Sequence, residues 1–127
     1  MIHVTVRGGL KTERQLAELA FWFALHELMP RKKNLDVEIH LKNLEEGYTG
    51  FQYTGDDTGH YHIEIQKKQD EDDFLTCIFH EMVHVKQDER GEYQGEDHLE
   101  YYDKPSEVEA YKLQEKLLKK WKGAHNE

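Results

Sequence analysis

Apolar and polar residues alternate along several stretches of the chain, the period of two that is typical of strands with one buried face. The pattern predicts strands at Ile2–Val6, Asn34–Leu44 and His60–Ile65. In the second of these we expect the odd positions to face the core. A shorter strand is expected within Gly47–Gly59, with a hairpin turn at GDDTG, residues 55–59.

A period near 3.6 replaces the alternation in three other stretches and predicts helices. The first begins at Thr12, which forms a capping box with Gln15, and ends before Pro30. Its expected buried residues are Leu16, Leu19, Ala20, Phe23 and Ala24. The second helix runs from about Asp73 to Arg90, with the acidic residues before it favouring its N-terminus. The third begins near Pro105 or Ser106.

The order of these elements indicates an α+β fold. At 127 residues the chain is expected to form one domain, residues 1–127. No apolar run has the length of a membrane span. The N-terminus reads as a strand rather than a signal peptide, so the expected location is the cytoplasm.

Charge and cysteine content narrow the classes of function. The formal net charge is −9, with 17 basic and 26 acidic side chains. This balance opposes nucleic-acid binding, which depends on positive charge at the phosphates. Cys77 is the single cysteine, so a disulfide framework and a four-cysteine zinc site are excluded. Any bound metal must be held by histidine and carboxylate.

The stretch FHEMVHVKQ, Phe79 to Gln87, carries the strongest chemical signal. His80 and His84 are four residues apart and lie on one helix face, where two ring nitrogens can bind one tetrahedral metal. Glu81 then lies beside the open coordination position. On a helical wheel both histidines fall opposite the apolar side of this helix, together with Gln87.

A third ligand has three candidates. Glu107 shares a face of the last helix with apolar residues, where a carboxylate is costly unless it is paired or binds a metal. Glu109 is expected among lysines, and His98 lies in the loop before the helix. We favour Glu107 and keep the other two as alternatives. His60 and His62, which share a strand face with Glu64, are expected to face solvent rather than form a second metal site.

The motif HEMVH followed by the ExxA pattern of Glu107 to Ala110 resembles a small zincin metallopeptidase of the gluzincin type. The nearest shapes are the minimal gluzincins and the short, phage-type SprT-like proteins. The resemblance implies a zincin-like core, in which a three- to four-stranded mixed sheet packs against the N-terminal, HExxH and glutamate-bearing helices. It also implies one Zn²⁺ per chain, bound by His80, His84 and Glu107. Gluzincins often have Asp or Asn after the ExxA alanine to orient a histidine, whereas this chain has Tyr111.

The function implied by the resemblance is hydrolysis of peptide bonds by a zinc-activated water, with Glu81 as the general base. A peptide or protein substrate would lie along the sheet edge, expected at the HYHIEI strand. Candidate donors to the oxyanion are Tyr93, Tyr101, Tyr102 and His98. The alternative function is a catalytically idle, zinc-stabilised protein-interaction module, but a pure structural clip has no need of Glu81.

Overall fold

The computed structural model describes residues 1–44, 50–54 and 59–125. In this part of the chain the elements follow one another as β1 (Ile2–Gly8), α1 (Lys11–Leu28), β2 (Leu35–Lys42), β3 (Gly50–Thr54), β4 (His60–Gln66), α2 (Glu71–Glu89), the 3-10 helix η1 (Tyr101–Asp103) and α3 (Pro105–His125). The α+β class is therefore confirmed. The turn expected at GDDTG lies outside the described residues, apart from Gly59. None of the described helices combines the length and apolarity needed to cross a membrane.

The four strands form one mixed sheet in the order β1-β2-β4-β3. Strands β1, β2 and β4 are parallel, whereas β3 pairs antiparallel with β4. The expectation that the HYHIEI strand forms the sheet edge is wrong, because β4 lies between β2 and β3. Strand β3, which precedes β4 in the sequence, pairs with the side of β4 that faces away from β2. The sheet edge beside α2 is therefore β3.

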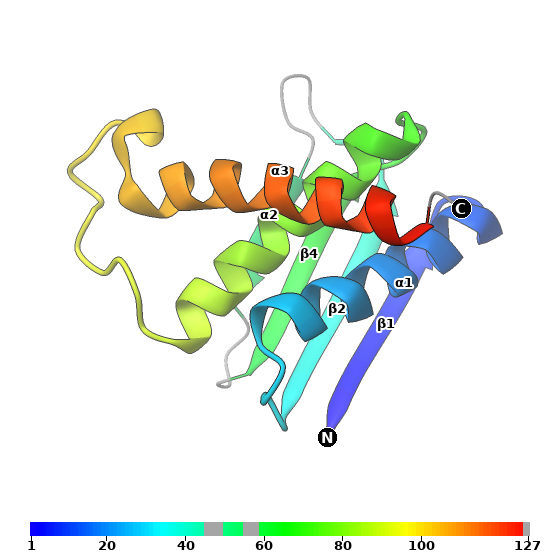
Figure 1. The fold of residues 1–127 in the computed structure, drawn as a ribbon, viewed down its shortest axis with the longest axis horizontal. Helices are drawn as coiled ribbons and strands as arrows, with labels where there is room; N and C mark the ends of the chain where they lie inside the picture. The colour runs from blue at the N-terminus through cyan, green and yellow to red at the C-terminus, as the bar shows by residue number, and fades with distance from the viewer. Residues whose placement is uncertain (45–49, 55–58, 126–127) are drawn as a thin grey trace.

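The core lies on one face of this sheet. Burial alternates along β2, where Leu35, Val37, Ile39 and Leu41 are buried as the period of two predicts. Helix α1 contacts β1, and α2 contacts β3 and β4. Helix α3 packs on α2 and α1, so it forms an outer layer rather than covering the sheet itself (Figure 1). The other face of the sheet has no helix over it in the described residues and carries polar side chains.

Helix α1 differs in detail from its expected form. It begins at Lys11 rather than Thr12, and its first turn is closed by Glu13, whose Oε1 accepts a hydrogen bond from the Leu10 amide at 2.7 Å. The buried residues are Ala17, Ala20, Phe21, Ala24 and Leu25, while Leu19 is 60% exposed. Apolar residues surround most of this helix, so its sequence alone leaves the choice of buried face open.

Candidate metal centre

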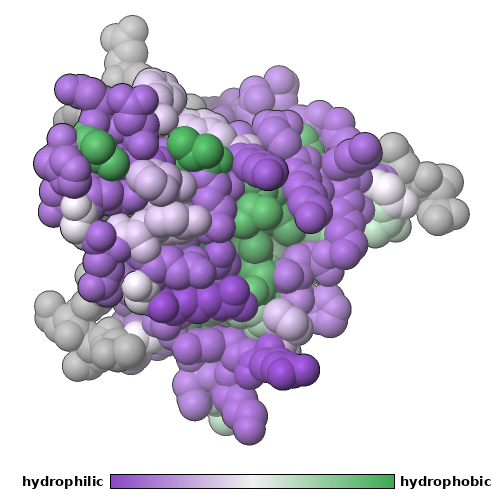
Figure 2. All heavy atoms as spheres, turned by 60° about the vertical axis from the view of Figure 1, so that its left-hand side comes forward, coloured by the Kyte–Doolittle hydropathy of each residue, from purple (hydrophilic) through white to green (hydrophobic). Residues whose placement is uncertain are grey.

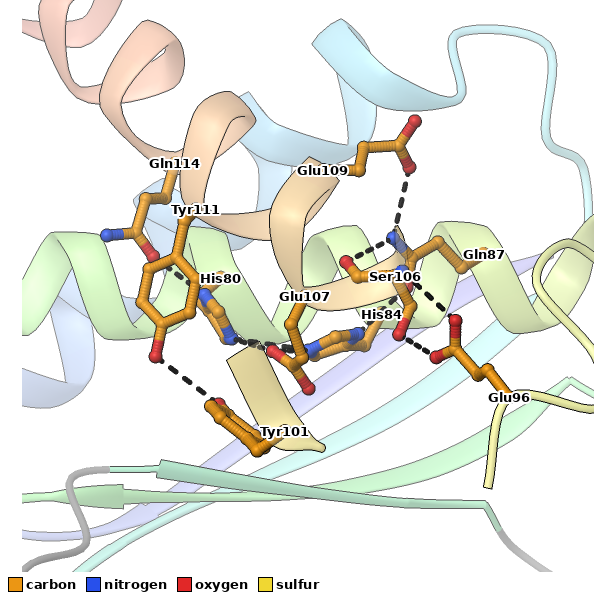
Figure 3. Close-up of polar contacts among 10 residues, drawn as sticks. All are labelled: His80, His84, Gln87, Glu96, Tyr101, Ser106, Glu107, Glu109, Tyr111 and Gln114. Carbon is orange, nitrogen blue, oxygen red and sulfur yellow. Dashed lines mark hydrogen bonds and ion pairs between the residues drawn. The ribbon is translucent and has the colours of Figure 1, made fainter. Parts of the chain in front are cut away.

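Three potential ligand atoms converge where α2 meets the first turn of α3 (Figure 3). Nε2 of His80 lies 3.0 Å from Oε1 of Glu107, and Nε2 of His84 lies 3.1 Å from the same oxygen. The two Nε2 atoms are 3.2 Å apart. Two ligands bound to one tetrahedral zinc at about 2.0–2.1 Å are themselves roughly 3.3 Å apart. The three atoms therefore have nearly the spacing of a ligand set.

The orientation of His84 is fixed by Gln87, one turn further along α2. The Gln87 amide nitrogen donates to the backbone oxygen of Ser106 at 2.9 Å and to Oε1 of Glu109 at 3.0 Å. The amide oxygen is therefore the atom that faces Nδ1 of His84, at 2.8 Å. Because an amide oxygen only accepts hydrogen bonds, the proton of a neutral His84 is on Nδ1. Its lone pair is then on Nε2.

His80 has a corresponding partner on α3. Oε1 of Gln114 accepts a hydrogen bond from Nδ1 of His80 at 2.7 Å, and both residues are buried. The lone pair of a neutral His80 is therefore also on Nε2. Gln114 thus orients the His80 ring, and the ring of Tyr111 lies 4.7 Å from that of His80.

The converging atoms are three electron-pair donors, and this arrangement favours positive charge between them. Burial lowers the pKa of His84, but the hydrogen bond to Glu107 and the charge of that carboxylate outweigh burial and raise it. Burial raises the pKa of Glu107, but its hydrogen bonds with His80 and His84 prevail and bring the pKa to about 2. A proton shared among the three groups satisfies the arrangement, and a divalent cation between them would also do so.

Polar contacts between α2 and α3 hold Glu107 in place. Lys86, which is buried, pairs with Oε1 of Glu109 at 2.8 Å. Ahead of α3, Glu96 accepts hydrogen bonds from the backbone amide and the hydroxyl of Ser106, which ties the preceding loop to the first turn of α3. The expectation that Glu109 points among lysines of its own helix is wrong, since it faces α2. Glu109 positions the helices and does not join the cluster.

Glu81 lies beside the cluster and is only 7% exposed. Burial raises the pKa of its carboxyl group, while the charges of His80 and His84 act in the opposite direction. On its other side Glu81 approaches the edge strand: a Cβ atom added to Gly50 of β3 would lie 3.3 Å from Oε2 of Glu81. A larger residue at position 50 would crowd this carboxylate. Glu81 therefore stands between the converging ligands and the sheet edge.

A cavity of about 800 Å³ opens over the cluster and is lined by Glu81, both histidines, Glu107 and Gly50. Of the expected donor candidates, Tyr101 lies at this cavity, and its hydroxyl is 3.3 Å from that of Tyr111 (Figure 3). Tyr102 also lines the cavity, but 74% of it is exposed. Tyr93 lines the cavity as well, but its hydroxyl donates to Glu109 at 3.1 Å. Burial raises the pKa of Tyr101, which keeps its hydroxyl protonated as a donor.

The other sequence candidates lie elsewhere. His98 is exposed in the loop and, among the described residues, belongs to no cluster of potential metal ligands. Gln114 was not anticipated from the sequence. It lies about two helical turns after Glu107 and therefore on the same face, a spacing that could have identified it. Gln87 was placed on the histidine side by the helical wheel, but its partner was not foreseen.

Three comparisons with known proteins give no match. No protein-family model, no curated protein and no solved structure matches this chain. The function must be argued from the geometry of the site.

Proposed function

We propose that this chain is a zinc-dependent metallopeptidase of the zincin type, with His80, His84 and Glu107 as the ligands of one Zn²⁺. The observation that carries the proposal is the direction of the two imidazole lone pairs. Gln114 and Gln87 hold the Nδ1 protons, so both Nε2 atoms and a carboxylate oxygen face one point. Two imidazoles and one carboxylate are a common ligand set of catalytic zinc, which leaves the fourth position open.

The position of Glu81 favours an enzyme over a structural zinc site. Burying a carboxylate almost fully costs free energy, and a role in catalysis would explain why the chain keeps one at this position. Glu81 has no hydrogen bond to another described side chain. Positive charge on His80 and His84 would favour its ionised form. A raised carboxyl pKa suits a group that accepts a proton and returns it.

The edge strand provides a place for the substrate. Gly50, at the start of β3, lies next to Glu81 at the cavity. In the part of the chain that the structure describes, β3 is the last strand of the sheet, and an extended peptide could pair with its outer side by backbone hydrogen bonds. We therefore propose that the substrate pairs with β3 and not with β4. A peptide bound there would bring its scissile bond close to Glu81.

Each residue then has a role in hydrolysis. Bound zinc supplies a Lewis acid that polarises the scissile carbonyl and makes water a stronger nucleophile. Glu81 takes the proton from the attacking water and delivers it to the nitrogen of the leaving amine. The Tyr101 hydroxyl donates a hydrogen bond to the carbonyl oxygen as negative charge develops on it. Gln87 and Gln114 keep the histidines in the required tautomer.

The surface near the cavity also bears on the alternative of an interaction module. Figure 2 turns forward the side that carries the loop before α3, and this face is mainly hydrophilic, with hydrophobic side chains in a strip near its centre and in two smaller spots at the upper left. A broad apolar patch, the usual mark of a stable docking face, is not in view there. This view therefore does not favour the interaction module.

The test combines metal analysis with a single substitution. The wild-type chain and Glu81→Gln are purified without added zinc, and the metal content of each is measured. Both are then incubated with an unstructured protein substrate. We expect about one zinc per chain in both proteins, because Gln at position 81 removes no ligand. Cleavage is expected only in the wild type, because Gln cannot accept the proton.

Glu71→Gln is the matched control, since Glu71 is an exposed acid at the start of the same helix. It should retain both zinc and cleavage. Equal cleavage by the Glu81→Gln and wild-type proteins would show either that Glu81 is not the general base or that the activity comes from a contaminant. The proposal would then fail, as it would if the wild type bound no zinc. Zinc without cleavage in the wild type would favour the interaction module.

A further inference from the structure

The polar face of the sheet carries a second group of potential ligands, on the side opposite to the helices. His40 of β2 and Glu64 of β4 are register partners in the parallel pairing of these strands. His62 lies two positions before Glu64 and so shares its face. The ligand atoms of the three residues all lie within 4.8 Å of one another. All three side chains are partly exposed, so an ion can reach them from solvent.

His62 has the geometry of an oriented ligand. Its Nε2 lies 3.3 Å from Oε2 of Glu64, the spacing of two ligands on one tetrahedral metal. On the other side of the ring, Nδ1 lies 3.3 Å from Oε1 of Glu38. A carboxylate that holds the Nδ1 proton of a metal-bound histidine is a recurring arrangement, and it leaves Nε2 for the metal. Glu38 lies beside Nδ1 of His62 at an ion-pair distance, in the position that this arrangement requires.

We propose that His40, His62 and Glu64 form a second, independent metal site, which binds a borderline divalent ion such as Zn²⁺, Ni²⁺ or Cu²⁺ at the open sheet face. Two imidazoles with one carboxylate suit these ions better than Mg²⁺ or Ca²⁺, which prefer oxygen ligands. Among the described residues the site has three protein ligands, which leaves further coordination positions for water.

The ammonium group of Lys42 competes with a metal ion for Glu64. Nζ of Lys42 lies 3.5 Å from the same Glu64 oxygen that faces His62. A metal ion would displace this ammonium group, and like charges so close together oppose binding. Removal of the lysine charge should therefore tighten metal binding at this site. Arg7 is more weakly involved, since its guanidinium pairs with Glu38 at 2.8 Å.

The test titrates Ni²⁺ or Zn²⁺ into the chain without a polyhistidine tag, after one equivalent of zinc has been loaded, and follows binding by calorimetry and native mass spectrometry. We expect a second equivalent in the wild type. His40→Ala and Glu64→Gln should each weaken that second equivalent at least tenfold, while Lys42→Gln should strengthen it several-fold. The variants alter a surface without core contacts, and circular dichroism checks that they fold.

His60→Ala is the matched control, because His60 is exposed on the same strand face but lies outside the group. It should bind the second equivalent as the wild type does. Metal binding that neither His40→Ala nor Glu64→Gln weakens would overturn the proposal, and so would equal weakening by His60→Ala and His40→Ala. His84→Ala tests the first site separately. It should abolish the tightly bound equivalent of metal at that site and leave the more weakly bound equivalent at the second site. The two proposals can therefore fail independently.

Discussion

Gln114 on α3 accepts a hydrogen bond from Nδ1 of His80 on α2 at 2.7 Å, and both side chains are buried. The bond crosses the contact between the two helices that carry the proposed ligands. It therefore links the tautomer of His80 to the packing of α3. A residue that touches neither metal nor substrate thus has a direct effect on the ligand set.

Gln114→Ala should weaken zinc binding by about tenfold to a hundredfold, because the His80 ring loses the acceptor that fixes its tautomer. Competition with a chromogenic chelator measures the affinity. Gln15→Ala is the control, since Gln15 is exposed on α1. Gln114→Glu, which restores an acceptor at the same position, should recover most of the affinity. An unchanged affinity in Gln114→Ala would remove the residue from the site.

Tyr101→Phe should lower kcat by about a hundredfold, the usual effect of losing one donor to the oxyanion. The zinc content should not change, because the Tyr101 hydroxyl is not among the proposed ligands. Tyr102→Phe is the matched control, as this neighbouring residue is 74% exposed. Steady-state kinetics on a fluorogenic peptide distinguish the two variants. Similar kcat values for both variants and the wild type would assign Tyr101 to packing.

Removal of the metal should destabilise the whole chain. A ligand that binds only the folded state stabilises it by about 4 kcal/mol when its free concentration is a thousand times Kd. For a chain of this size the corresponding fall in Tm on chelation is roughly 10–15 °C. Differential scanning calorimetry with and without a chelator measures it, and added zinc should restore the Tm. In His84→Ala the chelator should have little effect, and an equal fall there would point to a different site.

Glu89 gives a prediction for the dependence of stability on pH. Burial raises the pKa of Glu89, but its ion pair with Lys32 and the hydrogen bond from Tyr61 outweigh burial and lower it. A lowered carboxyl pKa contributes stability that is present above the unfolded value, 4.5, and is lost as the pH falls through the folded value. Glu89→Gln should therefore reduce the free energy of unfolding at pH 7 by roughly 1–3 kcal/mol.

This deficit should shrink as the pH falls below about 4, because the wild-type carboxylate then becomes protonated as well. Urea denaturation at several pH values measures it. The control is Glu18→Gln, which alters an exposed acid on α1 and should not change stability at either pH. A deficit that stays constant down to pH 3 would mean that the Glu89 charge does not matter.

Much of the fold could be predicted because single faces are buried. The alternation at Leu35, Val37, Ile39 and Leu41 identified β2, since one side of that strand meets the helices. The same reasoning selected Glu107, a carboxylate on an apolar helix face, and the structure brings it to the two histidines. The position of β4 inside the sheet could not be predicted, because strand order depends on pairing between distant segments.

Partnerships between elements were also beyond the sequence. Gln114 is a neutral residue on a helix full of polar side chains, and only the packing of α3 on α2 shows what it binds. For the same reason His40 was not linked with His62, since its partner lies on another strand and depends on the register of β2 with β4. The sequence suggested Thr12 as the helix cap, but in the structure the Leu10 amide donates a hydrogen bond to the Glu13 carboxylate.

The placement of the third proposed ligand on α3 also has a meaning in terms of chain topology. Glu107 follows His84 by 23 residues, and the intervening loop and η1 have few buried residues. A metal that joins the two acts as a removable cross-link, which closes this segment much as a disulfide would. For a loop of this length the loss of chain entropy is equivalent to about 3 kcal/mol. A chain with a single cysteine cannot form an internal disulfide, and the ion would provide the cross-link that disulfides provide in secreted domains.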